Sequence, residues 1–387
     1  MASWLLPEHF ADILPRQARS LERISRNIID LLTSYGFELV EPPLVEYVDS
    51  LLTGSASDLS RNTFKFTDQG DGGLLGLRAD MTPQVARIDA HILGRRGVTR
   101  LCYKGFVVHQ TPAHPLASRQ PYVVGAELFG SKGQRTDCEV IRLAVSAARR
   151  AGVQKMHLDI GHVGLVRALL AAETLTQEQT AMVLEALRLK DRVRLEPLAG
   201  VLTDEGMKAL VLLTETYGDL SVLATLRREL PARAGVAEAL DEVAYLAEHA
   251  GARFVSVDFC DVHGYGYLTG VSFAGYVEGL SQPVLRGGRY DSIGEAFGRA
   301  RPAVGFTVYL REIISTTYHA LPEAIVAPAE DSESLSKAMA ALREQGEIVV
   351  QLLPGEAAED LLSSFKIDRA LVRLDSQWVV QATEIRK

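Results

Sequence analysis

Hydrophobic residues at helical spacing open the chain, and patterns typical of strands follow them. Leu21, Ile24, Ile28, Leu31 and Leu32 predict a helix over 20–35 that stops at a glycine. The next five residues predict a strand that two prolines end. The same criteria predict further strands over 63–67, 74–77, 100–109, 122–129 and 154–160, and helices over 82–93 and 137–151.

The amino-acid composition changes over about 163–250, where Leu, Ala, Glu and Arg dominate and strand patterns are nearly absent. We therefore expect a mostly helical insertion between two strand-rich regions. Strand patterns return over 253–259, 266–273, 276–279 and 303–308, before a helix near 309–317. The segment 321–387 alternates short strands and helices, so we expect a core over 1–320 and a small C-terminal α/β domain over 321–387.

Composition narrows the class of protein. With 387 residues, 47% of them hydrophobic and 23% charged, the chain is ordinary for two or three folded domains. The net charge of −8, with −5 of it in 321–387, argues against binding nucleic acid through bulk electrostatics. We expect no membrane span, because no run of about 18 apolar residues occurs, and no secretory signal, because Glu8 and Asp12 come too early. The three cysteines lie far apart without a CxxC pair, so we expect no metal site and a cytoplasmic location.

Five stretches, in the same order along the chain, resemble those of histidyl-tRNA synthetases. They are LPEHFADILP at 6–15, GFELVEPP at 36–43, LRADMTPQVAR at 77–87, GYGYLTG at 264–270 and RGGRYD at 286–291. The match covers about 4–318, and the third stretch is most similar to a non-catalytic paralogue, the regulatory subunits of ATP phosphoribosyltransferase. The resemblance implies an α+β fold of the class II aminoacyl-tRNA synthetase type. In that fold, helices flank an antiparallel sheet, and the second stretch forms the contact between the two subunits of a dimer.

The resemblance also indicates which catalytic positions have changed. The motif 2 arginine and glutamate of the synthetases correspond here to His109 and Thr111, and the motif 3 arginine corresponds to Glu312. A further arginine, which contributes to activation, corresponds to His263. A guanidinium is permanently charged and offers a planar fork of donors to phosphate, which neither a neutral imidazole nor a carboxylate supplies. We therefore expect no aminoacylation, no catalytic residue and no cofactor.

The amino-acid pocket looks retained by the same comparison. Asp80 and Thr82 match positions that hold the α-amino group, and Glu127 matches a carboxylate that contacts the substrate. Tyr267 and Tyr290 match tyrosines of the histidine pocket. Carboxylates and tyrosine hydroxyls together suit an ammonium group and a ring N–H.

Simpler explanations remain open for each residue. Asp80 is a good N-cap for a helix from Thr82, and Glu127 is a plausible hydrogen-bonded strand carboxylate. The RGGR run taken alone predicts a tight turn, and the alternation of Tyr265 and Tyr267 favours strand packing.

Three functions compete. The first is a regulatory subunit that works with the short-form catalytic subunit of ATP phosphoribosyltransferase in histidine biosynthesis. It would take L-histidine as effector, form a dimer and bind no tRNA. The alternatives are an active histidyl-tRNA synthetase and an amino-acid adenylating enzyme, and both need the missing arginines to hold ATP.

Overall fold

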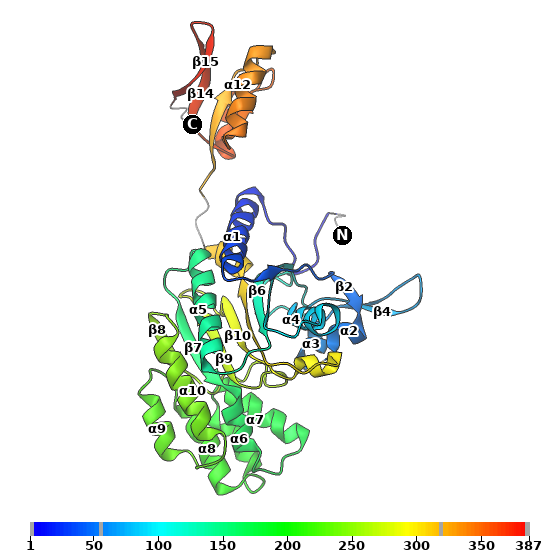
Figure 1. Ribbon diagram of the computed structural model, residues 1–387, viewed down its shortest axis with the longest axis vertical. Helices are drawn as coiled ribbons and strands as arrows, with labels where there is room; N and C mark the ends of the chain where they lie inside the picture. Colours follow the sequence, from blue (N-terminus) through cyan, green and yellow to red (C-terminus); the bar gives the residue numbers. More distant parts are fainter. Residues whose placement is uncertain (1–3, 54–56, 317–319, 384–387) are drawn as a thin grey trace. The chain divides into compact units, whose positions relative to one another are not determined.

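The computed structural model describes residues 4–53, 57–316 and 320–383 (Figure 1). The chain divides into two compact units, one of Met1–Ile13 and Gln17–Thr317 and the other of Leu14–Arg16 and Tyr318–Lys387. Each unit has its own sheet and its own apolar clusters. In the described part of the chain, no helix is both long and apolar enough to cross a membrane.

An eight-stranded sheet forms the centre of the larger unit, in the order β1-β5-β6-β11-β10-β9-β7-β8. Neighbours pair antiparallel except at the two edges, where β1 with β5 and β7 with β8 are parallel. The predicted antiparallel sheet is therefore mixed at its edges. The strands are β1 Glu38–Leu39, β5 Thr99–Phe106, β6 Tyr122–Phe129, β7 His157–His162, β8 Phe254–Val257, β9 Val271–Tyr276, β10 Leu285–Arg289 and β11 Ala303–Tyr309.

Helices bury one face of this sheet. Helix α5 (Gln134–Arg150) packs across β10 and β11 and contacts α10. Helix α1 (Pro15–Ser34) buries Leu21, Ile24, Ile28 and Leu32 in the same core, as the helical spacing predicts. Alternate strand residues, such as Val124, point into this core. The residues between them face the opposite side of the sheet.

Shorter elements lie beside the sheet. The predicted hairpin is present as β3 (Lys65–Thr67) and β4 (Leu74–Leu77), and β2 (Val45–Tyr47) completes a three-stranded sheet. The predicted helix over 82–93 begins as α4 (Thr82–Arg87) and continues as a π-helical turn, η1 (Ile88–Leu93). The remaining short elements are α2 Val48–Leu52, α3 Ser57–Asn62, η3 Ile293–Phe297 and α11 Leu310–Thr316.

The segment expected to be a helical insertion contains helices and no named strand among its described residues. Its leucines and alanines at i, i+3 and i+4 join the main core, which explains the Leu- and Ala-rich composition. The helices are α6 Val163–Leu170, α7 Gln177–Leu189, η2 Arg192–Leu198, α8 Asp204–Glu215, α9 Val222–Glu229 and α10 Val236–His249.

Two predictions between 264 and 291 are wrong. Residues 264–270 form turns instead of the start of a strand, because Gly264 adopts a positive φ of 76° and the chain reverses there. One strand, β9, replaces the two expected over 266–273 and 276–279. The RGGR run is not a tight turn, since it forms most of β10 in the interior of the sheet.

The smaller unit has a four-stranded sheet in the order β13-β12-β14-β15. Its strand β12 is apolar on both faces, because Ile325 packs in the cluster with α12 and Val326 in the cluster with η4. The predicted helix over 357–365 is a short 3-10 helix. The elements are β12 Glu323–Ala327, α12 Glu333–Glu344, β13 Val349–Gln351, η4 Ala358–Ser363, β14 Lys366–Leu374 and β15 Gln377–Ala382.

Candidate functional site

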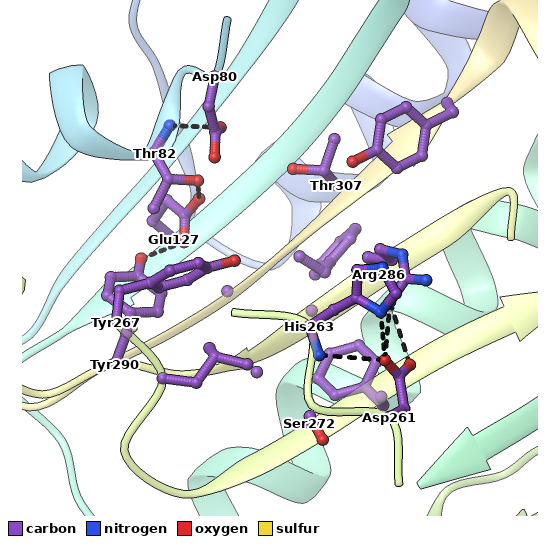
Figure 2. Close-up of a pocket in the computed structure, with 17 residues that line it drawn as sticks. Asp80, Thr82, Glu127, Asp261, His263, Tyr267, Ser272, Arg286, Tyr290 and Thr307 are labelled. Carbon is purple, nitrogen blue, oxygen red and sulfur yellow. Dashed lines mark hydrogen bonds and ion pairs between the residues drawn. The ribbon is translucent and has the colours of Figure 1, made fainter. Parts of the chain in front are cut away.

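A pocket of about 580 Å³, including the space at its mouth, lies on the sheet face opposite helix α5 (Figure 2). Two rows of paired residues form its floor. One row is Glu127, Gly305, Gly288 and Ser272, and the other pairs Thr307 with Arg286. The two adjacent glycines leave room above the strands, so the register of the sheet itself creates the pocket.

Three hydroxyls surround the buried carboxyl group of Glu127. The Thr82 hydroxyl contacts Oε1 at 2.9 Å, the Tyr103 hydroxyl contacts the same atom at 3.1 Å, and the Tyr290 hydroxyl contacts Oε2. The Thr82 N–H donates to Asp80 Oδ1 at 3.0 Å. The N-cap residue of α4 is Met81, without a side-chain cap, and not Asp80 as the sequence suggested. The Asp80 contact is a local turn bond, and Asp80 lines the pocket.

Gly305 is required at its position by Glu127. A Cβ there would lie 1.6 Å from Glu127 Oε2 and 2.6 Å from the Ala126 carbonyl oxygen. Burial raises the pKa of Glu127 to about 8, and the hydrogen bonds from Tyr290 and Thr82 only partly offset this. The group is therefore largely protonated at neutral pH until a cation approaches it.

Tyr267 and Tyr309 also line the pocket. Burial raises the pKa of both hydroxyls, that of Tyr309 to about 12. Neither hydroxyl donates to another of the described residues, so both are available to a ligand. Tyr267 reaches the pocket from the turns before β9, which corrects the interpretation that one member of the Tyr265 and Tyr267 pair packs in a strand.

Opposite the Glu127 cluster lies a second polar group that the sequence did not assign (Figure 2). Arg286 Nη1 donates to Asp261 Oδ2 at 3.0 Å, and His263 Nδ1 lies 2.7 Å from Asp261 Oδ1. Burial alone raises the pKa of Asp261, but the bond to His263 and the charge of Arg286 outweigh it and hold the pKa well below the usual range. The sequence contains Arg286 in the RGGR run, beside Arg289. Only the alternation of side chains along a strand shows that Arg286 faces the pocket and Arg289 faces away from it.

Three of the four changed positions lie outside the pocket lining. His109 is half-buried, with Nε2 3.1 Å from the Ala79 carbonyl, and desolvation lowers the pKa of its imidazole, so the ring is neutral at pH 7. Thr111 contacts Asn62, and Glu312 lies on α11. His263, the fourth, lines the pocket. Arg311 is bound to the carbonyls of residues 120 and 11.

The charges of the lining favour an amino acid over a nucleotide. Among the described lining residues, Asp80, Glu127 and Asp261 are acidic, and Arg286 is the one lysine or arginine. Its charge is already balanced by Asp261. An ammonium group therefore meets an excess of acceptors, whereas the single guanidinium of Arg286, already paired with Asp261, is too little positive charge for a triphosphate.

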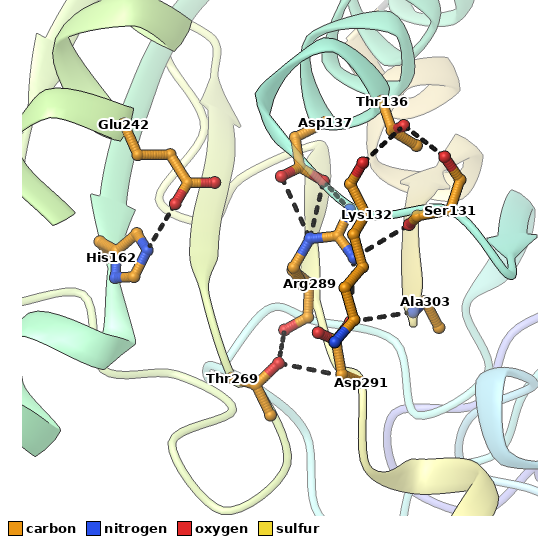
Figure 3. A network of polar contacts seen from close by, with 10 residues as sticks. All are labelled: Ser131, Lys132, Thr136, Asp137, His162, Glu242, Thr269, Arg289, Asp291 and Ala303. Atoms are coloured by element: carbon orange, nitrogen blue, oxygen red, sulfur yellow. Dashed lines mark hydrogen bonds and ion pairs between the residues drawn. The ribbon is translucent and has the colours of Figure 1, made fainter. Parts of the chain in front are cut away.

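A buried ion pair anchors the strand that carries the pocket floor (Figure 3). Arg289 points away from the pocket and donates from Nε to both oxygens of Asp137 on α5, at 3.0 and 3.1 Å. Its Nη1 donates to Asp291 at 2.9 Å. Asp291 in turn accepts from the Ala303 N–H at 3.0 Å. These bonds fix β10, and with it Arg286 and Tyr290.

Within 4–53, 57–316 and 320–383, no three His, Cys, Asp or Glu side chains are grouped so that they could hold a metal ion. All three cysteines are buried and free.

Known proteins share both the sequence and the fold. The family model for histidyl-tRNA synthetase matches residues 9–313, and that for the C-terminal domain of the ATP phosphoribosyltransferase subunit HisZ matches 322–381. The ATP phosphoribosyltransferase regulatory subunit of Paraburkholderia phytofirmans is 47% identical over 99% of this chain and 100% of its own length. That of Burkholderia pseudomallei is 46% identical over 98% and 100%.

Solved structures agree with these matches. An ATP phosphoribosyltransferase regulatory subunit/histidyl-tRNA synthetase from Bacillus halodurans has a TM-score of 0.81 at 28% identity, covering 94% of this chain and 97% of that one. A histidyl-tRNA synthetase from Nostoc sp. PCC 7120 has a TM-score of 0.78 at 16% identity, covering 99% and 97%, and shows the fold alone. The predicted synthetase-like fold and the predicted regulatory, non-catalytic class are confirmed. The chain belongs to the family of ATP phosphoribosyltransferase regulatory subunits.

Proposed function

We propose that this protein binds L-histidine in the pocket above β6, β10 and β11 and transmits that state to a short-form catalytic subunit of ATP phosphoribosyltransferase. The protein would be required for transferase activity and would make the enzyme sensitive to histidine, the end product of the pathway. The pocket carries this proposal, because it presents acceptors to an ammonium group and holds no unpaired arginine or lysine among its described lining residues.

The acceptors suit the polar hydrogens of histidine. Asp80 and Thr82 would receive the α-ammonium group, and Glu127 lies one hydrogen bond behind Thr82. Tyr267 and Tyr290 would flank the imidazole, whose ring N–H needs an acceptor. Regulation requires that histidine bind the inhibited assembly more tightly than the active one.

The assembly is proposed as a dimer, through the segment 36–43, acting in the cytoplasm. The smaller unit is a less favourable partner for tRNA, because 321–387 has a net charge of −5. Its part in the complex would be packing or support of the dimer.

Reconstitution tests the proposal. The catalytic subunit is assayed alone, with this chain, and with this chain plus histidine. We expect activity only with the chain present and inhibition on adding histidine. Asp80→Asn should keep the activation and weaken the inhibition, while Glu139→Gln, an exposed change on α5, should alter neither. If the chain neither activates the transferase nor makes it sensitive to histidine, the proposal is wrong.

The same preparation tests the alternative functions. Histidine-dependent exchange between ATP and pyrophosphate would identify an adenylating enzyme. We expect none, because the synthetase arginine positions are occupied by His109 and Glu312. A robust exchange signal would overturn the regulatory interpretation.

A further inference from the structure

We infer that Arg286 is the group that binds the carboxylate of the amino-acid ligand, with Asp261 as the residue that positions it. This inference rests on the proposed function, since it assigns the second half of the same pocket. Arg286 comes from the middle of β10, and its side chain is 25% exposed on the pocket side.

The guanidinium of Arg286 has donors left over. Only Nη1 is used, with bonds to Asp261 Oδ2 at 3.0 Å and Oδ1 at 3.4 Å. Its Nε and Nη2 donate to nothing among the described residues, and neither is a buried atom without a partner, so both are open to the pocket. A guanidinium offers five N–H donors in a planar fork that matches a carboxylate.

Other buried arginines of this protein are used more fully. Arg289 donates from all three nitrogens, to Asp137, Asp291 and the carbonyl of residue 131. Arg301 donates to Asp89, Thr99 and the carbonyl of residue 97. Arg286 thus keeps a free guanidinium edge at the wall of the pocket, and an anion is the ligand that would satisfy it.

Asp261 holds the guanidinium of Arg286 in place without occupying all of its donors. It contacts the Nη1 end of the guanidinium and accepts a second bond from His263. Burial opposes the charge of Arg286, but Asp261 beside it raises the pKa, so the guanidinium stays charged. The edge formed by Nε and Nη2 faces away from this contact and remains free for the ligand.

The spacing of the pocket fits a zwitterion. The lining includes Asp80, Arg286 and the hydroxyl-bearing Tyr267 and Tyr309. Both charges reach the two tyrosines, since Asp80 raises and Arg286 lowers their pKa. Figure 2 shows Asp80 and Arg286 on opposite sides of the cavity. Ammonium at Asp80 and carboxylate at Arg286 would bridge it.

A buried hydroxyl supports the same end of the pocket. Ser272 is 5% exposed, lines the pocket, and its Oγ has no hydrogen-bond partner among the described residues. It lies on the same sheet face as Arg286, beside the Ala274 that pairs with it. A buried unsatisfied hydroxyl is uncommon, and a ligand oxygen would supply its missing partner.

The test compares histidine with histamine, which has the amine and the imidazole but no carboxylate. Calorimetric titrations use the full-length wild-type chain, Arg286→Gln and the control Arg135→Gln, an exposed change on α5. Since a charged hydrogen bond is strong, we expect the wild type to prefer histidine by about 10- to 100-fold. Arg286→Gln should lose that preference, because its affinity for histidine falls while its affinity for histamine stays the same. Arg135→Gln should keep the preference.

Two further variants separate binding from folding. Arg286→Lys should restore part of the preference, and Arg286→Gln with Asp261→Asn removes the carboxylate that the single change leaves unpaired. Equal melting temperatures of the double variant and the wild type, with the preference still lost, would support the inference. If Arg286→Gln folds and still prefers histidine, the inference is wrong while the proposed function stands. If the wild type binds neither compound, the proposed function fails and the inference with it.

Discussion

Replacing Glu127 by glutamine should change how the stability of the protein depends on pH. Glu127 is 1% exposed, and burial raises its pKa from 4.5 to about 8. The folded state therefore binds a proton between these values that the unfolded state has lost. The stability that this proton supplies is complete below pH 4.5 and disappears as the pH rises through about 8.

The size of the effect follows from the two pKa values. A rise from 4.5 to about 8 corresponds to about 5 kcal/mol, at about 1.36 kcal/mol per unit of pKa. Glutamine is neutral at every pH, and its one carbonyl oxygen can accept from either Thr82 or Tyr290. Its amide NH2 group then faces the other hydroxyl, whose oxygen accepts. The free energy of unfolding of the wild type, minus that of Glu127→Gln, should therefore fall by about 4 kcal/mol between pH 4.5 and pH 8, because the group is only half titrated in one state at each end of this range.

Urea unfolding followed by far-UV circular dichroism measures this difference at each pH. The exposed change Glu139→Gln is the matched control, and its difference from the wild type should stay constant over the same range. Parallel pH curves for the wild type and Glu127→Gln would refute the reasoning, because they would mean that Glu127 has the same pKa folded and unfolded.

Three other expectations follow from the same geometry. Histidine affinity should rise more steeply from pH 6 to pH 8 for the wild type than for Glu127→Gln, since a bound ammonium favours ionised Glu127. The titration of the ligand's own imidazole, with an ordinary pKa of about 6.5, is common to both proteins, so calorimetry measures the difference between the two profiles. Gly305→Ala should weaken histidine binding at least 10-fold, because the new Cβ would displace Glu127 Oε2. The control Gly97→Ala should leave histidine binding unchanged, because a Cβ there meets no atom within 4 Å. Arg289→Met leaves the fully buried Asp137 unpaired and should cost about 3–5 kcal/mol in urea unfolding, part of which Asp137→Asn in the same chain should recover.

The sequence predicted elements well where one pattern dominates. The helical spacing of α1 and the insertion, and the turn-rich hairpin of β3 and β4, depend on local signals that the fold reinforces. Asp80, Thr82, Glu127, Tyr267 and Tyr290 line one pocket, as the family resemblance implied. Their spacing along the chain could not have shown this, because the register of β6, β10 and β11 brings them together.

The errors have a physical cause. Glycines usually indicate turns, yet Gly287 lies inside β10. This strand position requires glycine, because a Cβ there would be 2.2 Å from the Phe273 ring and 2.5 Å from the Gly305 carbonyl. That crowding comes from neighbouring strands and leaves no local signal. For the same reason the sequence did not separate Arg286, which faces the pocket, from Arg289, which faces α5.

Paired titrations of the wild-type chain with histidine and with magnesium-ATP test the central claim most directly. The claim is that the pocket receives an amino acid and has no cationic clamp for a triphosphate. Measurable heat with histidine, and none with magnesium-ATP at the same concentrations, is the predicted result. Tight binding of magnesium-ATP, with or without histidine, would contradict it.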